Sequence, residues 1–167
     1  MTLFEFNNLT EKEAFSCLFS CCGSSKWVQR LIAKMPFTSL EELENTADEV
    51  WSETTETDWL EAFTHHPKIG DIGSLEKKFA ATASWASSEQ AAVNQANREV
   101  LEFLAAENEA YWQKFGFIFI ICATGKSVAE MLDLLNQRLP NNKEKELKIA
   151  AEEQHKITHI RIEKLFA

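Results

Sequence analysis

The sequence has few residues that break helices: 167 residues contain five glycines and three prolines. Glycine and proline are the strongest signals for turns and loops, so their scarcity leaves room for long uninterrupted elements. No internal repeat, linker or low-complexity segment interrupts the chain. At this length, we expect one domain spanning residues 1–167 with one substantial core.

The chain also has no basic run, and its formal net charge is −9 with a pI near 5.0. A nucleic-acid partner is therefore excluded, because clustered lysine and arginine side chains must meet the phosphate backbone. An anionic substrate would need a local positive group to attract it, since the overall field repels it.

Long hydrophobic runs are missing as well. The longest, "FIFIICA" at 117–123, is far too short to span a bilayer, so we expect no membrane partner. The N-terminus shows no secretory signal pattern, and the final residues "KLFA" are not a peroxisomal tripeptide. We therefore expect a cytoplasmic protein.

Cysteine is limited to four residues, three of them in "CLFSCC" at 17–22. Cys17 and Cys21 share a helical face, but no further zinc ligands stand at a supporting spacing. We expect the cysteines to be reduced, small apolar residues of the core.

What the sequence does contain is a series of helix starts and stops. Capping pairs recur and apolar residues repeat at spacings of three and four, which predicts an all-α bundle of about seven or eight helices. The capping pairs are Thr10 with Glu13, Ser39 with Glu42, Ser87 with Gln90, Ser127 with Glu130 and Asn141 with Glu144; the apolar stripes are Val100, Phe103, Leu104, Trp112 and Phe115, and Val128, Met131, Leu132 and Leu135.

One segment differs from this pattern. "FGFIFIICATGKS" resembles a strand entering a phosphate-binding loop, but the position where that loop requires its first glycine is Ile120. We therefore reject a nucleotide-binding loop and predict a buried helix here, with a break at Thr124 and Gly125.

The stretch "WLEAFTHHPKIGD" places two adjacent histidines at a helix end. Neighbouring helical residues point about 100° apart, so His65 and His66 do not face one pocket from a regular helix. The residue before a proline leaves the α region, so His66 is free to aim into a cleft. Histidine is the usual proton donor or acceptor near neutral pH. Packing or capping is the plainer interpretation of His66 by itself.

Two further polar groups have both a plain and a chemical interpretation. Glu89 and Gln90 fall in the first turn of the predicted long helix, where they would cap it or bind an oxygen-rich ligand beside its free N–H groups. Arg161 borders the apolar stripe of the last helix, where it would extend to the surface or clamp a carboxylate.

Three alternatives remain open from the residues alone. His155 and His159 stand four apart and suit a metal ion, but no third ligand is apparent. His65, His66 and Asp71 would suit a metal-dependent hydrolase. A helical interaction module without chemistry would instead scatter His66, Glu89 and Arg161 over the surface.

Considered together, the motifs resemble a known family. The chain is similar to the OHCU decarboxylases over nearly its whole length. The resemblance lies in "HPKIG", the "W-x-x-x-EQA" pattern, "FGFIFIICATGKS", "RLPNNKEKELKIAAEEQHKI" and "IRIEKL". These enzymes act on 2-oxo-4-hydroxy-4-carboxy-5-ureidoimidazoline in the breakdown of uric acid and form (S)-allantoin.

The resemblance implies an all-α fold, usually a homodimer, that works on a small-molecule substrate without cofactor or metal. It implies catalytic roles for His66, Glu89 and Arg161. It also implies substrate contacts from these residues: Pro67, Gln90, Phe117, Ile118, Phe119, Ile120 and Ile121. Many members carry serine three residues before the glutamate, where this chain has Ala86; either Ser84, Ser87 or Ser88 would supply a hydroxyl instead, or this contact is absent.

Overall fold

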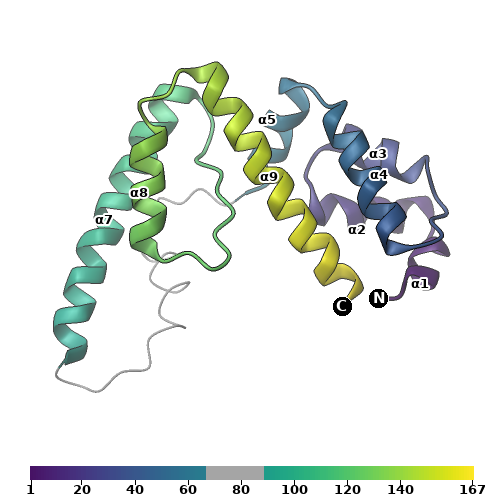
Figure 1. Ribbon diagram of the computed structural model, residues 1–167, viewed down its shortest axis with the longest axis horizontal. Helices are drawn as coiled ribbons and strands as arrows, with labels where there is room; N and C mark the ends of the chain where they lie inside the picture. Colours follow the sequence, from purple (N-terminus) through teal and green to yellow (C-terminus); the bar gives the residue numbers. More distant parts are fainter. Residues whose placement is uncertain (67–88) are drawn as a thin grey trace. The chain divides into compact units, whose positions relative to one another are not determined.

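The structure is a computed structural model that describes residues 1–66 and 89–167, with the backbone alone described at 89–97. In this part of the chain there are eight helices and no strand, which confirms the all-α class. The helices are α1 (Leu3–Asn7), α2 (Glu11–Cys21), α3 (Ser25–Ile32), α4 (Leu40–Ser52), α5 (Glu56–Thr64), α7 (Glu89–Phe115), α8 (Val128–Arg138) and α9 (Lys143–Phe166) (Figure 1). None of the described helices is long and apolar enough to cross a membrane.

The chain forms two compact units. The first contains Met1–His66 together with Leu147–Ala167, and the second lies within Pro67–Glu146. Each unit has its own buried side chains and polar contacts.

Capping residues place the helix starts largely where the sequence predicts them. Thr10 and Glu13 form a reciprocal capping box on α2, and Ser127 and Glu130 form one on α8. Each box satisfies two backbone N–H groups that have no partner within the helix. The start of α9 is shifted: the side chain of Asn142, one residue after the predicted cap, accepts a 2.8 Å hydrogen bond from Lys145 N.

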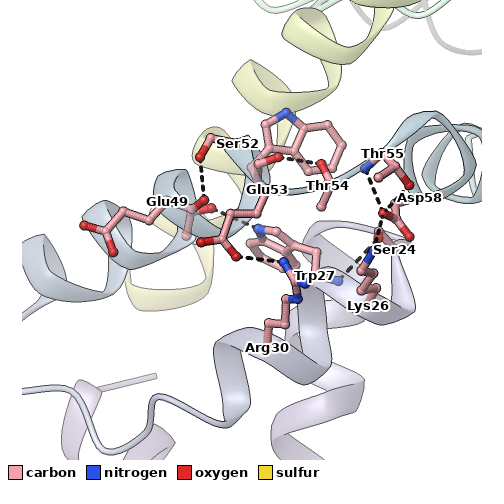
Figure 2. Close-up of polar contacts among 12 residues, drawn as sticks. Ser24, Lys26, Trp27, Arg30, Glu49, Ser52, Glu53, Thr54, Thr55 and Asp58 are labelled. Atoms are coloured by element: carbon pink, nitrogen blue, oxygen red, sulfur yellow. Dashed lines mark hydrogen bonds and ion pairs between the residues drawn. The ribbon is translucent and has the colours of Figure 1, made fainter.

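The first unit is built around aromatic residues that are excluded from solvent. Phe6, Trp27 and Phe63 are each at most 1% exposed, and each such burial contributes about 1.5–3 kcal/mol. Trp27 Nε1 donates a 3.0 Å hydrogen bond to Ala47 O, which joins α3 to α4. Figure 2 shows the polar contacts around this tryptophan, including an ion pair of 2.8 Å between Arg30 and Glu53.

The second unit is closed by a buried ion pair. α7 and α8 lie side by side (Figure 1). Arg138, at the end of α8, contacts Glu146 in the first turn of α9, and the Glu146 carboxylate also accepts from Tyr111 of α7 at 2.5 Å. Burial and the Glu146 hydrogen bond raise the pKa of the Tyr111 phenol. The ion pair joins α8 to α9, and the Tyr111 hydrogen bond adds α7.

The predicted helix at 117–123 is wrong: the segment is irregular and buried. Gly116 and Gly125, with φ of 78° and 76°, bound it in a conformation that glycine adopts without strain. Its carbonyls find side-chain donors instead of helical partners, since Arg138 donates to Ile120 O at 2.8 Å and Lys126 to Cys122 O at 2.7 Å. Aromatic and β-branched residues favour such an extended chain.

The apolar stripe predicted on α7 is partly wrong as well. Leu104 and Phe115 are buried, but Phe103 is 64% exposed and Trp112 39% exposed. Leu101 and Tyr111 are buried in their place, so the core face is rotated by part of a turn. Cys21, Cys22 and Cys122 are buried, as expected for small core residues, whereas Cys17 is only partly buried.

Candidate active site

His66 is the second residue after α5, and its backbone N–H is still hydrogen-bonded to the last turn of that helix. Its N–H donates to Phe63 O at 3.1 Å, while His65 N donates to Ala62 O at 3.2 Å. The two imidazoles diverge, as predicted. The His65 ring packs edge-on against Phe19 and over Gly23, where an added Cβ would lie 2.6 Å from the imidazole. The glycine at position 23 is therefore required by the His65 ring.

The His66 ring meets Gln154 of α9, and the contact is short. His66 Nε2 lies 2.5 Å from Gln154 Oε1, and Gln154 is fully buried. Gln154 Nε2 donates to Thr158 Oγ1 at 3.2 Å, and that hydroxyl donates to Gln154 O at 3.0 Å. A buried amide held at both ends in this way fixes the position of the ring beside it.

This network determines which ring nitrogen carries the proton. The Thr158 hydroxyl uses its hydrogen on Gln154 O, so it accepts from the amide N–H₂, and the amide oxygen faces His66. An amide oxygen only accepts, so His66 Nε2 must donate. In the neutral imidazole, Nδ1 is then unprotonated and able to take a proton.

Burial keeps this imidazole neutral near physiological pH. Burial is the largest cause of the lowered pKa of His66; the hydrogen bond to Gln154 opposes it, and the charges of Arg161 and His65 add to it. The positive charge of Arg161 therefore acts on the His66 imidazole within the first unit. The arrangement therefore places a neutral proton acceptor beside a fixed positive charge.

Arg161 lies two turns beyond Gln154 on α9, so both side chains emerge from the same face of the helix. Its Nη1 donates to Ser20 O at 3.3 Å and Cys21 O at 3.2 Å, at the C-terminal end of α2. Carbonyls at a helix C-terminus favour a cation. Among the described residues, both hydrogen bonds of Arg161 come from Nη1, which leaves Nη2 and Nε available to a ligand.

The other predicted site residues lie elsewhere in the chain. Glu89 and Gln90 begin α7, but their side chains lie outside the described part, as do Pro67, Ala86, Ser87, Ser88 and Asp71. Phe117, Phe119, Ile120 and Ile121 are buried in the second unit, and Ile118 is half-buried.

Sequence reasoning missed Gln154. Its signal was present in "AAEEQHKITHIR": a glutamine seven residues before Arg161 and four before Thr158, on the face that carries the core. A buried glutamine has to be hydrogen-bonded at both ends of its amide, which marks it as a residue that positions another.

Comparison with known proteins gives a consistent result. Residues 7–163 match the model of the OHCU decarboxylase family. Relatives include a uric acid degradation bifunctional protein TTL of Arabidopsis thaliana, 43% identical over 88% of this chain, and a 2-oxo-4-hydroxy-4-carboxy-5-ureidoimidazoline decarboxylase of Haloferax volcanii, 24% identical over the whole chain. This chain covers 45% of the plant protein and 97% of the archaeal one.

Solved structures agree with the sequence comparison. A crystal structure of an OHCU decarboxylase in the presence of (S)-allantoin is 41% identical, with a TM-score of 0.71 over 89% of this chain and 95% of that one. An (S)-allantoin synthase structure, 19% identical with a TM-score of 0.68, shares the fold over 99% of this chain and 54% of its own length. This chain belongs to the OHCU decarboxylase family.

Proposed function

We propose that this chain decarboxylates 2-oxo-4-hydroxy-4-carboxy-5-ureidoimidazoline (OHCU) to (S)-allantoin in uric acid breakdown, without a cofactor. The observation that carries the proposal is the pairing of His66, held by Gln154 as a proton acceptor, with the neighbouring Arg161 in a member of this family. A neutral base beside a fixed cation suits a small anionic substrate.

The reaction makes modest demands on the protein. The bond to the carboxylate breaks, CO₂ leaves, and the electron pair moves into the adjoining imine or carbonyl of the ring, so no covalent electron sink is needed. The product then forms when a proton reaches the ring carbon on one face. Holding the substrate in a single orientation lowers such a barrier and selects one mirror image.

His66 is the group proposed to move the proton. Its Nδ1 would accept hydrogen from the hydroxyl or carboxyl side of the substrate and help to return a proton to one face. The fixed Nε2–H···Gln154 bond supports this role, because it keeps the basic nitrogen directed away from the amide. A single acid–base group contributes on the order of 10²–10⁴-fold in rate.

Arg161 is proposed to hold the carboxylate or the ureido carbonyl through Nη2 and Nε. Charge-assisted hydrogen bonds of this type are about twice as strong as neutral ones. Glu89 and Gln90 are proposed to bind ureido or ring N–H groups, an assignment that rests on the family resemblance. Ala86 stands at the usual serine position, so either Ser84, Ser87 or Ser88 would supply that hydroxyl, or this contact is absent.

The remaining contacts are proposed from the same resemblance. Pro67 would lie beside the substrate, and the 117–121 segment would contribute backbone and apolar contacts. The burial of Phe117, Phe119 and Ile120 favours backbone contacts there, because these side chains are occupied in the core of the second unit.

The decisive test follows freshly generated OHCU by circular dichroism with and without the protein. Because OHCU decays unaided to racemic allantoin, only a chiral signal reports catalysis. We expect a rapid signal of (S)-allantoin with the native chain. His66→Gln should lower turnover by about 10²-fold or more, with little change in far-ultraviolet circular dichroism.

His65→Gln is the matched control, since it removes the neighbouring imidazole and leaves the His66–Gln154 bond in place. It should retain turnover. Near-normal decarboxylation by His66→Gln would remove His66 from the mechanism. A native chain that produces no chiral signal would contradict the proposed function as a whole.

We further propose that the chain works as one domain, in the cytoplasm and as a homodimer. The family match over residues 7–163 supports a single functional domain. The dimer and the compartment rest on the family resemblance and on the ordinary composition of the chain. Light scattering coupled to size-exclusion chromatography measures the dimer directly, since a monomer has a mass of 19.1 kDa.

A further inference from the structure

A second polar cluster lies in the first unit and takes no part in the proposed reaction. Asp48 of α4 faces His155 and His159, one helical turn apart on α9. Asp48 Oδ1 lies 2.7 Å from His159 Nε2 and 3.1 Å from His155 Nε2. The three ligand atoms all lie within 4.8 Å of one another. The structure thus supplies the third ligand that the sequence did not reveal.

The atoms meet at a common point without satisfying one another. Asp48 Oδ1 is enclosed from solvent, yet it accepts no hydrogen bond from the described residues, although two ring nitrogens lie within ion-pair distance. Ligand atoms that converge in this way, rather than pairing, are arranged as they would be around a shared cation.

The rings are held in place for such a role. Trp51 lies parallel to His155, with an interplanar angle of 1° and ring centroids 5.9 Å apart, and the two imidazoles contact each other edge to face at 4.7 Å. Burial lowers the pKa of His155 and the charge of His159 lowers it further, while Asp48 acts in the opposite direction. A neutral imidazole is the form that binds metal ions.

We propose that Asp48, His155 and His159 bind a divalent transition-metal ion of the Zn²⁺ type. Two imidazole nitrogens and one carboxylate oxygen are a ligand set that Zn²⁺ accepts, and the half-exposed Asp48 and His159 leave room for water as a fourth ligand. The ion would tie α4 to α9, the helix that also carries Gln154 and Arg161. This role is structural and does not depend on the proposed reaction.

The test uses the full chain without an affinity tag, first freed of metal with a chelator. Co²⁺ serves as the spectroscopic probe, and Zn²⁺ affinity is measured by competition with a chromophoric chelator. We expect one ion per chain, visible Co²⁺ absorption bands of low coordination number, and a rise in melting temperature with Zn²⁺ that grows with its concentration.

Variants separate a three-ligand site from a histidine pair on one helix. Asp48→Asn and His159→Gln should each weaken Zn²⁺ binding by at least about tenfold and remove the melting-temperature rise at low metal concentration. His65→Gln, which removes a histidine outside the cluster, should bind as the native chain does. Far-ultraviolet circular dichroism checks that every variant folds.

Two results would overturn the proposal. One is native affinity in Asp48→Asn, which would show that the carboxylate is not a ligand. The other is the absence of stoichiometric binding at micromolar Zn²⁺, which would leave the three residues as a histidine–carboxylate ion-pair cluster.

Discussion

At the scale of single residues, the proposed chemistry of His66 depends on Gln154. The neutral imidazole has two tautomers, and only the one protonated at Nε2 leaves Nδ1 as a base. The buried amide selects that tautomer because its own orientation is fixed by Thr158. Gln154 is therefore a positioning residue, and its replacement should change the pH profile as well as the rate.

Two substitutions of Gln154 should shift the profile in opposite directions. The proposed base must be neutral, so kcat/KM falls as the pH drops through the pKa of His66, which lies below its usual value. Gln154→Glu places a negative charge beside Nε2, which raises this pKa, so activity should be lost about one to three pH units higher. Gln154→Leu removes a contact that raises the pKa, so the acid limb should move lower.

The plateau of the profile provides the second measurement. Gln154→Leu lets the wrong tautomer compete, so the plateau should fall, but by less than the about 10²–10⁴-fold that loss of the acid–base group costs. Gln154→Glu keeps an acceptor at Nε2 and should retain more of the plateau. If both variants gave the native profile at reduced yield of folded protein, Gln154 would be a packing residue only.

At the scale of elements, the ion pair between Arg138 and Glu146 is the contact most sensitive to change. Glu146 is fully buried and accepts from Arg138 Nε at 2.7 Å, from Asn141 at 2.9 Å and from Tyr111. Removing its charge leaves the buried guanidinium of Arg138 without a counter-charge. Glu146→Gln should lower the free energy of unfolding by about 3–5 kcal/mol in urea titrations.

The control is Glu152→Gln, an exposed residue of the same helix, which should change stability by no more than about 0.5 kcal/mol. Replacing both partners, as Arg138→Met with Glu146→Leu, should recover part of the loss, because no unpaired charge then remains. A Glu146→Gln variant as stable as the Glu152→Gln control would show that the ion pair contributes little.

Local sequence patterns predict the helix starts well and the buried 117–123 segment poorly. Helix starts are local, since the cap and its partner lie three residues apart, so Thr10 and Ser127 were found from the sequence alone. The 117–123 segment failed because its carbonyls are satisfied by Arg138 and Lys126, and the first of these lies eighteen residues beyond its partner Ile120. Hydrophobicity is the same for a buried helix and a buried irregular segment, so only such distant donors distinguish them.

At the scale of the whole molecule, long-range partners limited the prediction of the site. His66 and Arg161 were predicted as site residues because each has a distinctive chemistry and a place in the family pattern. Gln154 and Asp48 were not, because each acquires its role only when α9 meets α5 and α4. A glutamine or an aspartate within an amphipathic helix has the same appearance in sequence whether it is a surface residue or a partner of histidine.

The net charge of −9 leads to a prediction about the whole molecule and its one proposed clamp. An anionic substrate is repelled by the overall field and attracted locally by Arg161, and salt screens both over a Debye length of about 8 Å at 0.15 M. Arg161→Gln should lower kcat/KM by about ten- to a hundredfold, as expected for a lost charged hydrogen bond. The remaining kcat/KM should rise with ionic strength, because only repulsion is left to screen. In the native chain, kcat/KM should rise less with ionic strength, or should fall.

Arg161→Lys is the matched control: it keeps the charge and loses the planar fork, so it should restore the native salt response but not the full rate. If Arg161→Gln and the native chain responded alike to salt, the substrate would not be held by this guanidinium.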